Sequence, residues 1–144
     1  MTRFSSIGWL IVASAVAGTT LEAAPPPTIE GLEFFEKRIR PVLVENCYEC
    51  HSAGKKTKGG LALDTRDATL RGGESGAAFV PGEPDKSRLI EAVRYKNRDL
   101  QMPPKGALSG AQIRDLEAWV KMGAPDSREA QPVTATSQRV IDIE

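Results

Sequence analysis

The sequence predicts an all-α protein built from three to five short helices. Apolar residues recur at helical spacing in several separate segments. Polar residues that cap helices stand where these segments begin, and Gly or Pro stands where they end. Glycine and proline are also frequent between the segments, with 13 and 10 copies in 144 residues. The pattern therefore indicates short helices joined by turns and loops.

The first helical segment follows a proline-rich spacer, residues 25–31. Thr28 or Glu30 precedes the segment, and its charged residues fall opposite its apolar ones. Pro41 interrupts the pattern, so it either kinks the helix or begins a second short helix at its first turn. The apolar positions are Leu32, Phe35, Ile39, Val42 and Leu43.

Two further segments follow a loop of small and basic residues. Residues 65–70 can form one or two helical turns before a glycine-rich stretch breaks the chain. Asp85 or Ser87 can then cap a helix. Its apolar face consists of Leu89, Ile90 and Val93.

The last helix has the clearest boundaries. Ser109 and Gln112 form a capping-box pattern at its start, and Gly123 and Pro125 terminate it. Met122 falls in its last turn, where a methionine usually fills the core. Its apolar residues are Ile113, Leu116, Trp119 and Val120. Trp119 is expected to pack in the core by default, although its size would also allow contact with a bound group.

Residues 47–51 carry the most specific chemical signal. They read Cys47, Tyr48, Glu49, Cys50 and His51, which is the pattern Cys-x-x-Cys-His. Two thiols at this spacing can add to the two vinyl groups of a haem, and the following His then lies over the iron. The chain has two Cys and one His in total. The pattern therefore predicts one haem, attached through Cys47 and Cys50, with His51 as an axial ligand.

Three other uses of the two thiols remain open at this stage. A redox-active dithiol normally stands at the start of a helix, whereas this pair follows a helical segment. A zinc site needs four ligands, and Cys47, Cys50 and His51 supply three. A disulfide between Cys47 and Cys50 would close a very small loop and leave His51 without a role.

Met102 is the candidate for the second axial position. It stands before Pro103 and Pro104, whose fixed φ angles stiffen the loop that would hold the sulfur. A thioether is a soft ligand suited to haem iron, and ligation by Met and His raises the reduction potential. The other methionines are Met1 and Met122.

The first 24 residues are expected to be a signal peptide. Arg3 gives a short positive region, an apolar run spans Ile7 to Ala17, and small residues follow. The run is short for a membrane span, which needs about 20 residues. An uncleaved membrane anchor is the alternative. In both cases we expect the domain to be exported to the periplasm or another extracytoplasmic space.

Charge gives no sign of a nucleic-acid partner. Lys plus Arg and Asp plus Glu number 19 each, and no basic stripe with interleaved aromatics is present. Lys55, Lys56 and Lys58 follow the Cys-x-x-Cys-His motif and can form a docking patch for an anionic partner. A solvated edge is the favoured interpretation. We expect a monomer that contacts redox partner proteins, and a membrane only if the N-terminal segment is retained.

The order of these motifs resembles the planctomycete-type cytochrome c domain over about residues 32–125. Besides the Cys-x-x-Cys-His motif, the resemblance rests on Gly59-Gly60-Leu61, Pro81-Gly82-Glu83-Pro84 and Met102-Pro103-Pro104, followed by the helix through Trp119. It implies a compact cytochrome c fold wrapped around one covalent haem, with His51 and Met102 as axial ligands. Residues 126–144 are expected to be a polar linker or tail, from a longer parent protein or from a frayed terminus.

The predicted function is one-electron transfer rather than catalysis on a substrate. Leu61, Leu63, Ile113 and Trp119 are expected to give the haem apolar surroundings. The alternative is a haem-based sensor or ligand-binding module with an open or weakly held sixth position. An accessory module that passes electrons to an attached catalytic region is compatible with the first function.

Overall fold

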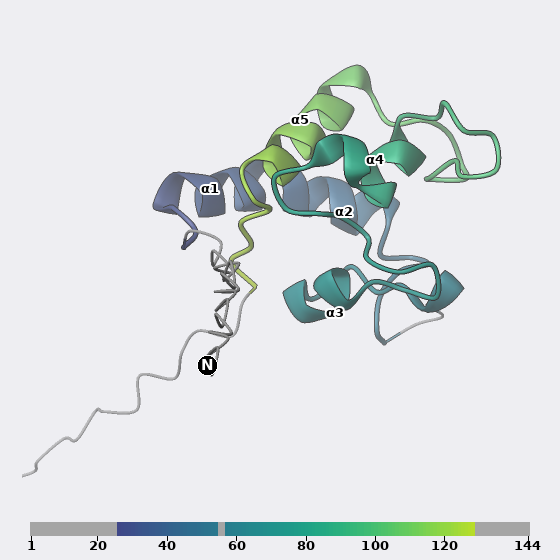
Figure 1. Ribbon diagram of the computed structural model, residues 1–144, viewed down its shortest axis with the longest axis horizontal. Helices are drawn as coiled ribbons and strands as arrows, with labels where there is room; N and C mark the ends of the chain where they lie inside the picture. Colours follow the sequence, from purple (N-terminus) through teal and green to yellow (C-terminus); the bar gives the residue numbers. More distant parts are fainter. Residues whose placement is uncertain (1–25, 55–56, 129–144) are drawn as a thin grey trace, which may run out of the picture.

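The computed structural model describes residues 26–54 and 57–128, and this part of the chain is helical (Figure 1). Five α-helices are joined by one π-helical and two 3-10 segments. Within the described ranges no strand forms, and the single β-type pairing is the isolated bridge between Gly73 and Gly76. The predicted all-α class is confirmed.

One continuous helical stretch leads to the Cys-x-x-Cys-His motif. It comprises α1 (Ile29–Phe34), the π-helical turn η1 (Phe35–Ile39) and α2 (Arg40–Asn46). The Thr28 hydroxyl accepts a hydrogen bond from the Gly31 amide at 3.1 Å, as expected of a capping residue. Pro41 lies in the first turn of α2, directly after the π-helical turn, so it starts a new element without breaking the helical stretch.

Short elements follow the motif. They are η2 (Lys58–Gly60) and α3 (Arg66–Arg71), and the Thr65 hydroxyl caps α3 by accepting from the Ala68 amide at 3.2 Å. Gly72 ends α3 with a φ of +74°. A Cβ atom at this position would lie 2.0 Å from the Gly76 carbonyl oxygen, so only glycine fits the turn.

A second pair of helices completes the fold. The 3-10 turn η3 (Pro84–Lys86) leads into α4 (Arg88–Val93), and α5 (Gly110–Lys121) follows a long loop. The capping box of Ser109 and Gln112 is present, as predicted. Ser87 occupies the N-cap position of α4, but its hydroxyl serves the preceding turn by accepting from the Val80 amide and donating to the Glu83 carbonyl.

The core lies where η1 and α5 pack together. The Phe35 and Phe79 rings lie 5.9 Å and 5.2 Å from the Trp119 ring, between centroids. The Trp119 indole donates to the Pro125 carbonyl at 2.7 Å, and the chain after α5 turns back toward the part of the molecule where α3 lies (Figure 1). Met122 is 48% exposed at the end of α5, so the prediction that it fills the core is wrong.

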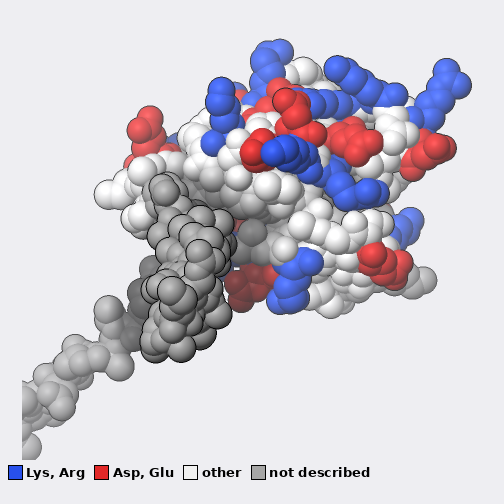
Figure 2. Space-filling view, in the orientation of Figure 1, with Lys and Arg blue, Asp and Glu red and all other residues white. Residues whose placement is uncertain are grey.

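Charges of both signs are mixed over the face that Figure 2 shows, mainly in the region of α4 and α5. Lys58 is exposed, while Lys55 and Lys56 lie outside the described residues. The predicted signal peptide and residues 129–144 of the predicted tail also lie outside them. None of the described helices combines the length and the apolar character needed to cross a membrane.

Candidate functional site

The end of α2 delivers the two thiols and the imidazole to one place. The Cys47 amide still donates to the Leu43 carbonyl at 2.9 Å, so Cys47 continues the helix by one residue. The amides of Cys50 and His51 both donate to the Cys47 carbonyl, at 3.2 Å and 2.9 Å. This turn folds Cys50 and His51 back beside Cys47.

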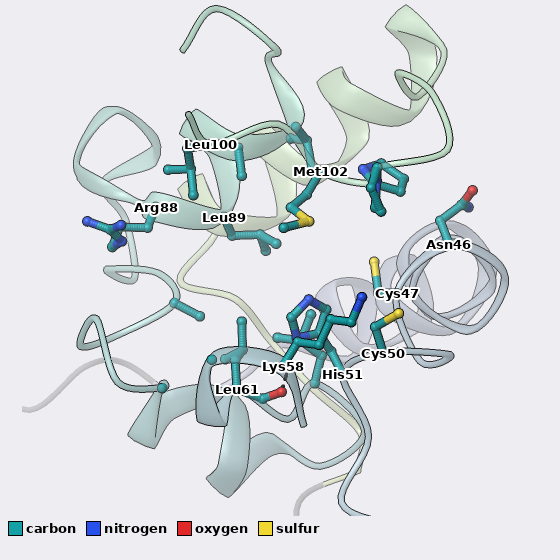
Figure 3. Close-up of a pocket in the computed structure, with 18 of the residues that line it drawn as sticks. Asn46, Cys47, Cys50, His51, Lys58, Leu61, Arg88, Leu89, Leu100 and Met102 are labelled. Atoms are coloured by element: carbon teal, nitrogen blue, oxygen red, sulfur yellow. Dashed lines mark hydrogen bonds between the residues drawn. The ribbon is translucent and has the colours of Figure 1, made fainter. Parts of the chain in front are cut away.

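A cavity of about 580 Å³ opens beside this turn. Its volume lies within the range of roughly 300–1,000 Å³ that is usual for cofactor and ligand sites. Figure 3 shows the Cys47 and Cys50 sulfurs at one side of it, with the His51 and Met102 side chains pointing toward one another from opposite sides. The four predicted site residues therefore border the same space.

Most of the remaining lining is apolar. Residues from the loop after the motif, from α4 and from the Met102 loop contribute it. The apolar lining includes Leu61, Leu63, Ala78, Leu89, Val93, Leu100 and Pro103. Trp119 and Ile113 are absent from this lining, so the expectation that they surround the haem is wrong, whereas the core position expected of Trp119 by default is confirmed. Leu61 and Leu63 lie where they were expected.

His51 is held from its far side by the backbone of a neighbouring loop. Its ring nitrogen Nδ1 lies 3.1 Å from the Leu61 carbonyl oxygen, and its own carbonyl accepts from the Leu63 amide at 2.8 Å. A proton on Nδ1 satisfies the Leu61 carbonyl and leaves Nε2 with its lone pair. The partner of the imidazole is thus the Leu61 carbonyl, ten positions after His51 in the chain.

The Met102 loop is anchored to α4. The Met102 amide donates to the Ala92 carbonyl at 3.2 Å, and the Tyr95 hydroxyl donates to the Pro103 carbonyl. On the exposed rim, Lys105 forms an ion pair with Glu49 at 2.5 Å between nitrogen and oxygen. This pair connects the Met102 loop to the Cys-x-x-Cys-His motif. It is exposed, so it contributes little to stability.

Local chemistry disfavours the other uses of the thiols. Cys47 and Cys50 are free, and burial raises the pKa of the Cys47 thiol to about 11. A redox-active dithiol needs a lowered thiol pKa and usually a helix N-terminus, whereas this motif follows the end of α2. Among the described residues, no group of three or more His, Cys, Asp or Glu side chains is arranged to hold a metal ion.

The donor set fits a covalently attached haem. Two free thiols lie at one side of the cavity, and a nitrogen and a thioether sulfur, both suited to haem iron, face each other across it. Lys58 and Arg88 also line the cavity, and neither forms an ion pair or side-chain hydrogen bond with another described residue. In the sensor alternative, the sequence allows Arg88, Arg94 or Arg98 to serve as a distal group, and of these three only Arg88 lines the cavity.

Comparison with known proteins gives one finding. Residues 47–106 match the protein family described as Planctomycete cytochrome C. This segment begins at Cys47 and contains both thiols, His51 and Met102. A search of curated proteins and a search of solved structures each found no significant match.

Proposed function

Residues 47–106 belong to the Planctomycete cytochrome C family, and from this premise we propose a function for the chain. It is a c-type cytochrome that transfers single electrons through one covalently bound haem, with His51 and Met102 as axial ligands. The observation that best supports the proposal is the convergence of two free thiols, an imidazole and a thioether on one apolar cavity.

Each thiol has a defined part in attachment. Cys47 and Cys50 would hold the haem by adding to its two vinyl groups. Each sulfur would bond to one vinyl carbon, and the thiol hydrogen would pass to the other carbon. No oxidant is consumed, because an addition balances its own atoms. The raised pKa of Cys47 keeps that thiol protonated at neutral pH.

The remaining residues set the preference between two oxidation states. When bound, the haem supplies an iron that holds or releases one electron. The Met102 sulfur favours the ferrous form, and the apolar lining excludes water and disfavours the extra charge of the ferric form. The hydrogen bond from His51 to Leu61 fixes the ring and raises the basicity of the ligating nitrogen. Lys58 and Arg88 are available to face the haem carboxylates.

The cellular location that we propose for this activity rests on the sequence. We propose that the domain is exported, because residues 1–24 have the features of a signal peptide and covalent haem attachment is completed after export. Its partners are then redox proteins that meet it outside the cytoplasm. A monomer is the proposed state, and membrane attachment would require that the N-terminal segment be retained.

Absorption spectra test the proposal directly. The protein is produced in a host that matures cytochromes c, and a pyridine haemochrome assay is combined with spectra with and without reductant. We expect one c-type haem per chain in a six-coordinate low-spin state, with a weak far-red band from sulfur bound to ferric iron. High-spin haem would favour the sensor alternative, and absence of bound haem would refute the proposal.

A further inference from the structure

Arg128 lies beyond the family-matched segment and is held in a fixed orientation by Asp126. Its Nε and Nη2 donate to the two carboxylate oxygens of Asp126 at 2.9 Å and 2.6 Å, and its backbone amide donates to the same carboxylate at 2.9 Å. The side chains are 9% and 2% exposed. A buried bidentate pair of this kind fixes geometry, whatever its net contribution to stability.

The remaining guanidinium nitrogen reaches the haem motif and the loop beside it. Arg128 Nη1 donates to the Leu63 carbonyl at 2.7 Å and also to the Tyr48 hydroxyl. The guanidinium carbon lies 4.8 Å from the centre of the Phe35 ring, which adds a cation–π contact. Tyr48 stands between the two cysteines of the motif. One side chain therefore joins the motif, the loop and the core.

The loop that Arg128 holds is the one that orients His51. The Leu63 amide donates a hydrogen bond to the His51 carbonyl at 2.8 Å, and the Leu61 carbonyl oxygen lies 3.1 Å from His51 Nδ1. Leu63 is thus fixed on one side by His51 and on the other by Arg128. Movement of this segment would lengthen or tilt the bond at Leu61, because only one residue separates the two leucines.

We propose that Arg128 is a positioning residue for His51. It holds Tyr48 and Leu63 in place, and through the Leu61 carbonyl it sets the strength of the hydrogen bond at Nδ1. A strong bond there makes the imidazole a better donor to iron and favours the ferric state. The inference rests on the proposed function, since it requires His51 to be bound to haem iron.

The test uses a variant that removes the interaction without changing net charge. Replacing Asp126→Asn together with Arg128→Gln deletes one negative and one positive group. We expect the midpoint potential to rise by at least about 28 mV. This rise corresponds to a threefold higher ferrous-to-ferric ratio at a fixed potential, since a tenfold change takes 59 mV for one electron. We also expect the His51 Nδ1 proton to exchange with solvent at least tenfold faster. Because the chain has one His, ¹⁵N-histidine labelling reports this residue alone.

A matched control removes a different Arg–Asp pair. Arg38 and Asp115 form an ion pair at 2.9 Å between η1 and α5, and neither residue lines the cavity. Arg38→Gln with Asp115→Asn makes the same change of charge, and we expect no change in potential or Nδ1 exchange. If the Asp126 and Arg128 variant carries covalent haem and behaves like this control, the inference is overturned.

Two further measurements cover the case in which that variant does not fold. Arg128→Lys keeps the charge and loses the planar fork, so we expect a smaller shift in the same direction, and an unshifted potential would count against the role of Arg128. In the wild-type protein the Nδ1 proton should be protected, and rapid exchange there would overturn the inference. Failure of the proposed function is distinct, because wild-type protein would then lack covalent haem or show an unligated His51.

Discussion

The imidazole Nδ1 of His51 lies 3.1 Å from the carbonyl oxygen of Leu61. The single histidine of the chain is thereby oriented by a loop that follows the Cys-x-x-Cys-His motif, while Met102 reaches the same cavity from a loop after α4. The two proposed iron ligands thus depend on different parts of the fold. They can be tested separately.

Met102→Ala should lower the midpoint potential and allow carbon monoxide to bind the ferrous protein, because the sulfur that favours ferrous iron is lost. We expect a fall on the order of 100 mV, within the roughly 0.8 V over which axial ligands set haem potentials. Redox titration and difference spectra measure both effects. Met122→Ala is the control, since Met122 lies at the exposed end of α5. An unchanged potential in Met102→Ala would remove Met102 from the ligands.

Replacement of the thiols should change how the haem is held. Cys47→Ala or Cys50→Ala should each leave one thioether, which shifts the pyridine haemochrome band toward longer wavelength because one vinyl group stays unsaturated. The double variant should release its haem into acidified organic solvent. Intact mass and haem staining of denaturing gels check these outcomes. Haem that stays covalently bound in the double variant would contradict attachment through these residues.

Trp119→Phe should weaken the fold without changing the haem environment. The indole donates to the buried Pro125 carbonyl at 2.7 Å, and loss of that donor should cost about 1–3 kcal/mol of unfolding free energy. The midpoint potential should not change, because Trp119 does not line the cavity and the bonds from Arg128 to Asp126 and Leu63 do not involve the indole. Denaturant unfolding and redox titration measure the two quantities. Val44→Ala, at a half-exposed position, should alter stability by no more than about 0.5 kcal/mol.

Stability at alkaline pH should depend on Tyr48. Burial raises the pKa of its phenol, and the positive charges of Arg128 and Arg40 offset this only in part. A group with a raised pKa in the folded state stabilises the fold fully below its unfolded pKa, here about 10, and loses that contribution as pH rises through the folded value. The denaturant concentration at the unfolding midpoint of the ferrous protein should therefore decrease as the pH is raised above 10. Tyr48→Phe should reduce that decrease. Equal slopes in the two proteins would exclude Tyr48 as the cause.

Two glycines with positive φ angles should tolerate alanine differently. At Gly82, φ is +81° and no atom lies within 4 Å of the position that an alanine methyl group would take, so alanine should cost about 1–2 kcal/mol. A loss of that size lowers the melting temperature by about 5–15 °C in a domain of this size. Gly72→Ala adds a clash with the Gly76 carbonyl and should lower it much further. Equal melting temperatures for the two variants would contradict the turn geometry.

Local signals in the sequence predicted much of the fold. Thr28, Ser109 and Gln112 cap helices as their residue types indicate, and Pro41 stands in a first helical turn. Such features act within a few residues, so the sequence displays them directly. Ser87 is an exception among these capping residues. Its hydroxyl forms hydrogen bonds with the turn before α4 and not with the first amides of the helix.

The predicted site residues converge on one cavity, yet their supports could not be predicted. Leu61 and Arg128 act through contacts that the chain makes only after folding, and Arg128 meets Leu63 across 65 positions. No spacing rule links residues so far apart. Met122 and Trp119 illustrate the same point. Helical periodicity places both residues at a helix but does not decide what each side chain packs against.

The packing of η1 against α5 closes most of the chain into one large loop. Arg38 and Asp115, which bridge these elements, lie 77 positions apart. Every residue of the family-matched segment, 47–106, falls inside that loop and outside the two elements that close it. The segment that carries the family signature therefore depends for its closure on two elements that lie outside the family match. A fragment limited to it would retain both thiols, the imidazole and the thioether, and would lack the contact that brings the ends of the loop together.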